Sequence, residues 1–147
     1  MSKTEAAELF NLGMESLKSG DTGAALDYLE KAVALERVPL YCSHLAICLA
    51  KEKKEFKKAV SLCNEALRHD PKNSIHFLHL GRVHLMANQK KDALRIFGMG
   101  MRYGENREII AELRKFGRRR RPAIPFLERD NPLNKIIGKL TYKMGFR

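Results

Sequence analysis

The sequence predicts an all-α protein built from stacked pairs of antiparallel helices. Apolar residues recur every three or four positions through residues 4–113, which is the helical period, and no stretch alternates as a strand would. Turn-forming residues interrupt this pattern at short intervals, and a set of small and large residues repeats about every 34 positions. The 147 residues, 44% of them hydrophobic, suffice for one domain or a short array of repeats.

Six breaks divide residues 4–117 into seven expected helices. They lie at Ser19–Asp21, Val38–Pro39, Lys53–Glu55, Asp70–Asn73, Asn88–Gln89 and Gly104–Asn106. Gly20 suits the left-handed end of a helix, and Asp21 can cap the start of the next one. Pro39 fits the first turn of a helix, whereas Pro71 stops one. Each break therefore has a local chemical reason.

The expected helices repeat in pairs. In the second helix of each pair, Ala25, Ala59 and Ala93 are 34 residues apart, and each is followed by a large or medium residue (Leu29, Cys63, Phe97) and a small one (Ala32, Ala66, Gly100). The first helices carry Leu9-x-x-Leu12-Gly13, Cys42-x-x-Leu45-Ala46 and Phe77-x-x-Leu80-Gly81. Small residues let neighbouring helices approach closely. We therefore expect burial between pairs of Leu12, Ala25, Leu29, Leu45, Ala59, Leu80, Ala93 and Phe97.

These residues resemble the tetratricopeptide repeat, or TPR, a helix–turn–helix unit of 34 residues. The third copy, with Phe77, Leu80-Gly81, Ala93 and Phe97, is the most similar to the repeat pattern. The chain departs from it at Ser16 and His84 (usually aromatic), Arg37 and Glu105 (usually Pro) and Gly100 (usually Ala). The resemblance implies a TPR-type α-solenoid over residues 4–117, with repeats at about 6–38, 39–73 and 74–107 and a capping helix at 106–117.

The resemblance also implies a function, because TPR arrays are scaffolds whose first helices line a concave groove for a peptide or a helix. The second apolar face of these helices predicts the groove residues Phe10, Met14, Leu17, Leu40, Ile47, Ile75, Leu78, Arg82 and Leu85. Chaperone-binding TPRs hold a terminal carboxylate with Lys, Arg and Asn. The matching positions here are Phe10, Met14, His44, Ile75 and His79, so that carboxylate clamp is absent.

Several patterns that suggest chemistry have simpler explanations. His76, His79 and His84 are close in sequence but point in different directions on a helical wheel, so we expect no metal site. The glycines of residues 98–104 lack the spacing and the preceding strand of a phosphate loop. The three cysteines form no C-x-x-C pair, which indicates a reducing, cytoplasmic compartment. We therefore expect neither enzymatic activity nor a cofactor.

The tail, residues 118–147, differs from the rest of the chain. Residues 114–147 carry a net charge of +9 out of the total of +11. The tail opens with Arg118, Arg119, Arg120 and Arg121, continues through two prolines, and carries the apolar residues Ile124, Phe126, Leu127, Ile136 and Ile137. Over residues 133–143 the apolar residues fall on one helical face and lysines on another, which predicts a short amphipathic helix.

The sequence thus predicts a non-enzymatic scaffold or adaptor that binds an apolar or amphipathic segment of another protein in its groove. The tail itself is a second candidate occupant, within its own molecule or in a second copy. The alternative function is association with nucleic acid or an anionic membrane through the basic tail. Steep salt dependence would distinguish phosphate binding from apolar binding.

Overall fold

The computed structural model describes residues 2–119, and all regular structure in that range is helical. The helices are α1 (Ser2–Lys18), α2 (Thr22–Leu35), α3 (Pro39–Lys53), α4 (Phe56–His69), α5 (Ser74–Met86), α6 (Lys90–Gly100) and α7 (Arg107–Arg119), with a 3-10 turn, η1, at Met101–Tyr103. The described part of the chain therefore confirms the all-α prediction, and its helices begin and end close to the predicted breaks.

The caps explain these boundaries. Asp21 accepts a hydrogen bond from the backbone N–H of Ala24 at 2.9 Å, so its side chain begins α2 as the sequence predicts. Asn73 caps α5 by accepting from the N–H of Ile75, and Asn106 accepts from the first amides of α7. Gly20 has a positive φ of 85°, which a residue without a Cβ adopts at little cost.

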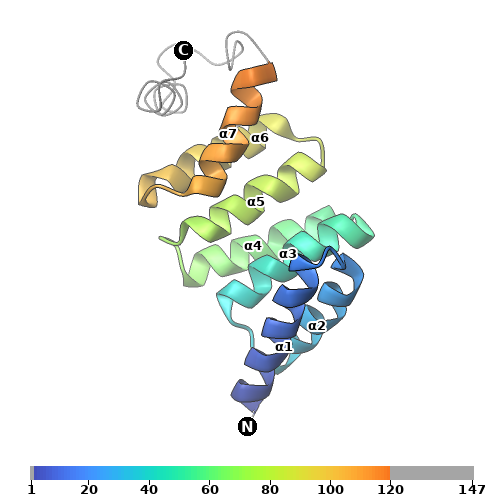
Figure 1. Ribbon diagram of the computed structural model, residues 1–147. Helices are drawn as coiled ribbons and strands as arrows, with labels where there is room; N and C mark the ends of the chain where they lie inside the picture. Colours follow the sequence, from blue (N-terminus) through green and yellow to red (C-terminus); the bar gives the residue numbers. More distant parts are fainter. Residues whose placement is uncertain (1, 120–147) are drawn as a thin grey trace.

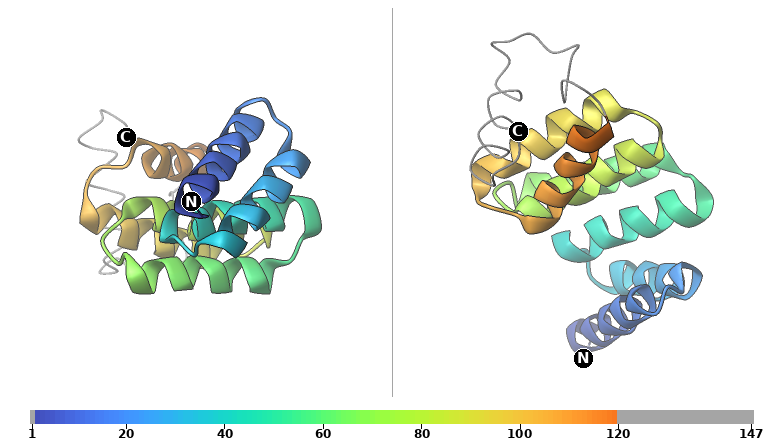
Figure 2. Two further views of the ribbon diagram at one scale, coloured as in Figure 1. Left: turned by 90° about the horizontal axis from the view of Figure 1, so that it is seen from below. Right: turned by 45° about the horizontal axis from the view of Figure 1, so that its top comes forward.

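The pairs stack along one axis, from α1 and α2 at one end to α7 at the other (Figure 1). Within each pair the helices pack on one another, and α2 contacts α3, α4 contacts α5, and α3 contacts α5. The right-hand view of Figure 2 shows the N-terminus at the opposite end of the stack from α7. This order makes the first helices of successive pairs neighbours.

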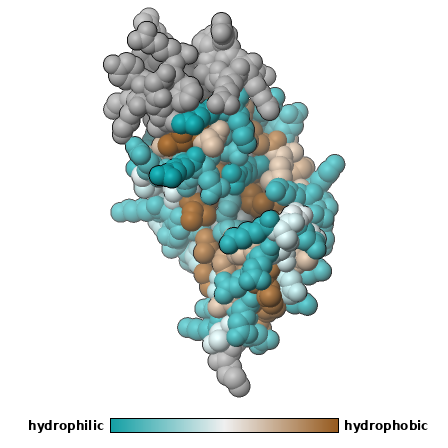
Figure 3. Space-filling model, viewed as in Figure 1, coloured by the Kyte–Doolittle hydropathy of each residue, from teal (hydrophilic) through white to brown (hydrophobic). Residues whose placement is uncertain are grey.

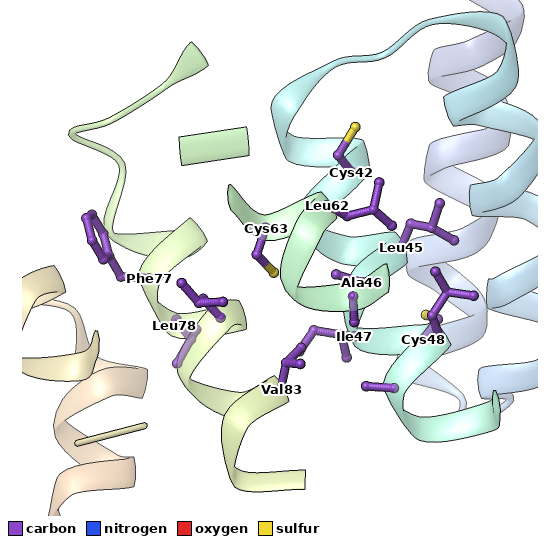
Figure 4. Close-up of a cluster of buried hydrophobic side chains, with 14 of the residues drawn as sticks. Cys42, Leu45, Ala46, Ile47, Cys48, Leu62, Cys63, Phe77, Leu78 and Val83 are labelled. Atoms are coloured by element: carbon purple, nitrogen blue, oxygen red, sulfur yellow. The ribbon is translucent and has the colours of Figure 1, made fainter. Parts of the chain in front are cut away.

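The core is continuous across the described pairs. Figure 4 shows its central part, where Ile47 of α3 and Val83 of α5 lie close together, and Cys63 of α4 belongs to the same buried cluster. The predicted small positions Ala25, Ala59 and Ala93 are fully buried, as are Leu29 and Phe97. The sequence correctly predicted the core of the second helices.

Glycines in the first helices compensate for large residues in the second ones. A Cβ on Gly81 would lie 2.2 Å from the ring of Phe97, and one on Gly13 would lie 3.0 Å from Leu29. In the middle pair, Ala46 occupies the position of Gly13 and Gly81. Its methyl group fits because Cys63, which is smaller than leucine or phenylalanine, occupies the facing position on α4. At Gly100 the arrangement is reversed, since this glycine lies in the second helix α6 and a Cβ there would meet Phe77 of the first helix α5 at 2.7 Å.

One predicted core residue is wrong. Leu12 occupies the repeat position of Leu45 and Leu80, yet 42% of its surface is exposed, against 5% and 3% for the other two. The physical reason is its place in the stack, because no helical pair precedes α1 within the described residues. The repeat pattern therefore predicts which face a leucine occupies, but burial also requires a neighbouring pair.

Candidate functional site

A row of side chains crosses the first helices of the three pairs. The ring of Phe10 in α1 stacks on Tyr41 in α3, with centroids 4.5 Å apart, and meets the edge of His44 at 5.4 Å. His44 in turn packs edge-to-face on His79 of α5, at 4.4 Å. Each ring is carried by a different turn of helix, and the stacking of α1, α3 and α5 brings them together.

Charged side chains continue this row from α5 to α7. Arg82 follows His79 by almost one turn of α5. Its Nε lies 3.0 Å from Glu112, and a terminal nitrogen lies 3.2 Å from Glu108. Only 10% of the Glu112 side chain is exposed, and Lys115 lies 3.5 Å from it. The row therefore consists of Phe10, Tyr41, His44, His79, Arg82, Glu108 and Glu112.

Behind the row, one buried hydroxyl joins two histidines. Ser43 Oγ lies 3.0 Å from Nδ1 of His76 and 3.0 Å from Nδ1 of His79. The other ring nitrogen of His76, Nε2, lies 3.1 Å from a carboxylate oxygen of Asp70. Ser43 and His76 are fully buried, and His79 is 6% exposed. The sequence reading treated His76 and His79 as divergent, but the structure brings both to Ser43.

Burial sets the protonation state of these histidines. It lowers the pKa of His79 well below its ordinary value, and the nearby His44 and Arg82 lower it further. Burial also lowers the pKa of His44 and of His76, although hydrogen bonds to Leu40 and to Asp70, respectively, oppose this. The three imidazoles are therefore neutral at pH 7 and can accept hydrogen bonds.

The predicted groove residues divide into two groups. Half-buried residues on the first helices are Phe10, Met14, Leu17, Leu40, Arg82 and Leu85, and Ile75 is more exposed, at 36%. Ile47 and Leu78 instead lie in the core, 8% and 2% exposed, so we withdraw both as lining residues. They were misassigned because α3 and α5 contact each other and bury that part of their second apolar face.

The predicted tail residues lie almost entirely outside the described part of the chain. The backbone of Arg118 and Arg119 ends α7. Arg120, Arg121, Ile124, Phe126, Leu127, Ile136 and Ile137 are not among the described residues, and neither is the amphipathic helix predicted over residues 133–143. Their roles stay predictions.

Sequence reasoning missed Tyr41, Ser43, Glu108 and Glu112. A signal for the centre of the row was nevertheless present. His44 and His79 are 35 residues apart, the same offset as between Leu45 and Leu80, so they hold the same position in successive repeats. Treating the histidines of α5 on a single helical wheel concealed this relation between helices.

The remaining reactive residue types are inert or dispersed. Burial raises the pKa of Cys42 and Cys48 to about 11 and that of Cys63 to about 12, so the thiols stay protonated and unreactive. Across residues 2–119, no three His, Cys, Asp or Glu side chains gather in an arrangement that could hold a metal ion. None of the helices described is long and apolar enough to cross a membrane.

Solved structures with a similar fold are TPR domains. The first TPR of Spaghetti (RPAP3), bound to the HSP90 peptide SRMEEVD, has a TM-score of 0.65 and 22% identity over 77% of this chain and 93% of its own. The first TPR domain of human RPAP3 has a TM-score of 0.67 and 18% identity, over 95% and 98% of the two chains. The TPR2B domain of yeast Sti1, in complex with pHsp70, has a TM-score of 0.59 and 18% identity over 95% of this chain and 98% of its own.

These likenesses establish that the chain has the TPR fold, as its repeat pattern predicts. No family model matches the sequence, and no curated protein does either.

Proposed function

We propose that the protein is a non-enzymatic interaction scaffold that holds a peptide segment of another protein along the first helices of its pairs. The observation that carries this proposal is the row, which crosses α1, α3, α5 and α7 with the half-buried rings of Phe10, Tyr41 and His44 and the buried ring of His79. A surface that joins all the repeats in this way suits an extended or helical segment rather than a small molecule. In support, the first TPR of Spaghetti was solved bound to an HSP90 peptide, and the TPR2B domain of yeast Sti1 was solved in a complex with pHsp70.

The chemistry of the row favours an apolar or amphipathic segment. Phe10, Met14 and Ile75 stand where chaperone-binding TPRs carry groups for a carboxylate. Arg82, the cation of the row, already pairs with both Glu108 and Glu112, which neutralise it. A terminal carboxylate would therefore find no free positive charge among the row residues. The face seen in Figure 3 carries small apolar patches between polar side chains, as an amphipathic ligand would require.

The test is selection of peptides from a random display library by the full-length protein, followed by titration of the selected peptides. Phe10→Glu should weaken their binding by about tenfold or more, because it places a charge in the ring stack. Leu35→Glu is the matched control, since it puts the same charge on an exposed leucine of α2. Equal affinities in both variants would contradict a site on the first helices.

Salt provides a second criterion. Binding by apolar burial should change little between low and high salt, whereas binding to phosphates weakens steeply. A steep salt dependence that Phe10→Glu does not affect would favour the alternative of nucleic acid or membrane binding through the tail.

A further inference from the structure

We propose that Asp70, His76, Ser43 and His79 form a hydrogen-bond relay that presents an acceptor nitrogen in the row, so that the bound segment must bring a hydrogen-bond donor to His79 and His44. This inference rests on the proposed function and names the ligand chemistry that it requires. The relay begins at Asp70, whose side chain is 45% exposed at the end of α4, and runs through two fully buried groups to the row.

The partners fix the proton on each group in turn. The hydrogen bond to Asn73, with a smaller contribution from His76, lowers the pKa of Asp70, so the carboxylate is ionised and only accepts. His76 must therefore donate its Nε2 proton to Asp70, which leaves Nδ1 of the neutral ring as an acceptor.

The hydrogen bonds of Ser43 determine which ring nitrogen of His79 carries the proton. A hydroxyl carries one proton. Ser43 Oγ also lies 3.3 Å from the carbonyl oxygen of Leu40, but His76 Nδ1 is nearer, at 3.0 Å, and requires the proton, because two lone pairs would otherwise face each other. His79 Nδ1 also lies 3.0 Å from Ser43 Oγ and must then be the donor of that bond. The proton of the neutral His79 ring is consequently on Nδ1, and Nε2 carries a lone pair.

His44 reaches the same state independently. Its Nδ1 lies 2.9 Å from the carbonyl oxygen of Leu40, which can only accept, so the ring donates from Nδ1 and keeps a lone pair on Nε2. The two rings pack edge-to-face at 4.4 Å. No hydrogen-bond partner for Nε2 of either ring is found among the described residues, and neither nitrogen is among their fully buried unpaired atoms, so both can accept a hydrogen bond from a ligand.

A ligand that covers the row removes water from these nitrogens. An apolar side chain placed there would leave a buried acceptor without a partner, which is costly. An amide, hydroxyl or indole N–H would satisfy it. The charged groups around the two rings are Arg82 on α5, Glu108 on α7 and Asp70 beyond His76, whereas the α1 contact, Phe10, is uncharged. Because Arg82 is already paired with Glu108 and Glu112, the charges around the two rings are balanced, and hydrogen bonding rather than net charge selects the ligand group.

Nitrogen-15 NMR of the imidazoles in the full-length protein tests the relay without any ligand. At about pH 7.5, His44 and His79 should be protonated on Nδ1 and His76 on Nε2. Asp70→Ala removes the solvent end of the relay and leaves the core intact, so His79 should become a mixture of tautomers. Asp92→Ala is the control, since that carboxylate is similarly exposed on α6. An Nε2 proton on His79 in the unaltered protein would overturn the relay.

Affinity tests the donor requirement. In peptides selected by the full-length protein, replacing each donor by its isostere (Thr by Val, Tyr by Phe, Asn by Leu) should identify one position that costs about tenfold or more. The same replacement should cost almost nothing with His79→Phe, and its full value with His69→Phe, a change at an exposed histidine outside the relay. Selected peptides that bind on the first helices but tolerate every isostere, and also N-methylation of each backbone amide, would refute the donor requirement alone. If no peptide binds there, the proposed function fails as well, while NMR still decides the relay.

Discussion

At the scale of single residues, the tightest constraint is the contact between Gly81 and Phe97. A Cβ on Gly81 would lie 2.2, 2.5 and 2.7 Å from three atoms of the Phe97 ring, and that ring is fully buried and cannot swing aside. Alanine is the better helix former by about 1 kcal/mol, so propensity alone would make Gly81→Ala stabilising. Here packing outweighs propensity, because the helix must shift to admit the methyl group.

We therefore expect Gly81→Ala to lower the free energy of unfolding by about 1–3 kcal/mol in chemical denaturation. Adding Phe97→Leu should recover part of this loss, because leucine is what the first pair uses opposite Gly13. Gly13→Ala, with its nearest contact at 3.0 Å, should cost less than Gly81→Ala. Equal costs at the two glycines would contradict the compensation between small and large positions.

The buried histidines make stability depend on pH. Because the folded state lowers the pKa of His44, His76 and His79, the unfolded chain binds protons at a pH where the folded protein does not. As pH falls through the ordinary histidine value, the unfolded state gains protons first, so the free energy of unfolding decreases. Stability is full above that value and is lost on acidification toward the lowered pKa values.

Urea unfolding at about pH 7.5 and about pH 5.5 should show this loss, and His79→Phe should reduce the difference between the two. His69→Phe provides the comparison, since it makes the same substitution at an exposed histidine outside the buried group. A stability that is the same at both pH values would mean that the histidines titrate normally in the folded protein.

At the scale of the helix, three leucines at the same repeat position differ in burial, because they differ in what packs against them. Leu45 and Leu80 each lie between two pairs and are almost fully buried, whereas Leu12 lies at the open end of the stack. Replacement by alanine should cost about 2–5 kcal/mol at Leu45 and Leu80 and less than about 1 kcal/mol at Leu12. Denaturant midpoints of the three variants test this, and a large loss at Leu12 would show that something covers α1 in solution.

The same contrast explains what the sequence could predict. Helix boundaries depend on local chemistry, such as the Asp21 cap and Pro39 at the start of α3, and these were read correctly. The burial of Ile47 and the joining of His76 and His79 at Ser43 depend on how α3 packs against α5. Such contacts join residues more than 30 positions apart. Predicting them requires the alignment of one repeat against the next, which the periodicity of a single helix does not give.

At the scale of the whole molecule, the first helices present a surface long enough for the tail of the same chain to cover. The 28 residues after Arg119 carry apolar side chains, and the chain from Arg119 to Ile136 can span roughly 55 Å when extended. Neighbouring helices lie about 10 Å apart, so this length reaches from α7 back across α5 and α3 to α1. Apolar burial would have to hold the tail there, because the row offers little net charge to a basic segment.

If the tail of the protein occupies its own row, Ile136→Asp together with Ile137→Asp in the full-length chain should release it. Amide hydrogen exchange should then become faster in α1, α3 and α5 but not in α2, and binding of an apolar dye should increase, because half-buried rings such as Phe10 become exposed. Lys135→Gln with Lys139→Gln is the matched control, since it lowers the net charge by the same amount but on the polar face of the predicted helix. Release by the isoleucine pair alone indicates apolar docking. An unchanged exchange pattern in both variants would show that the row is open in the free protein and receives its segment from another chain.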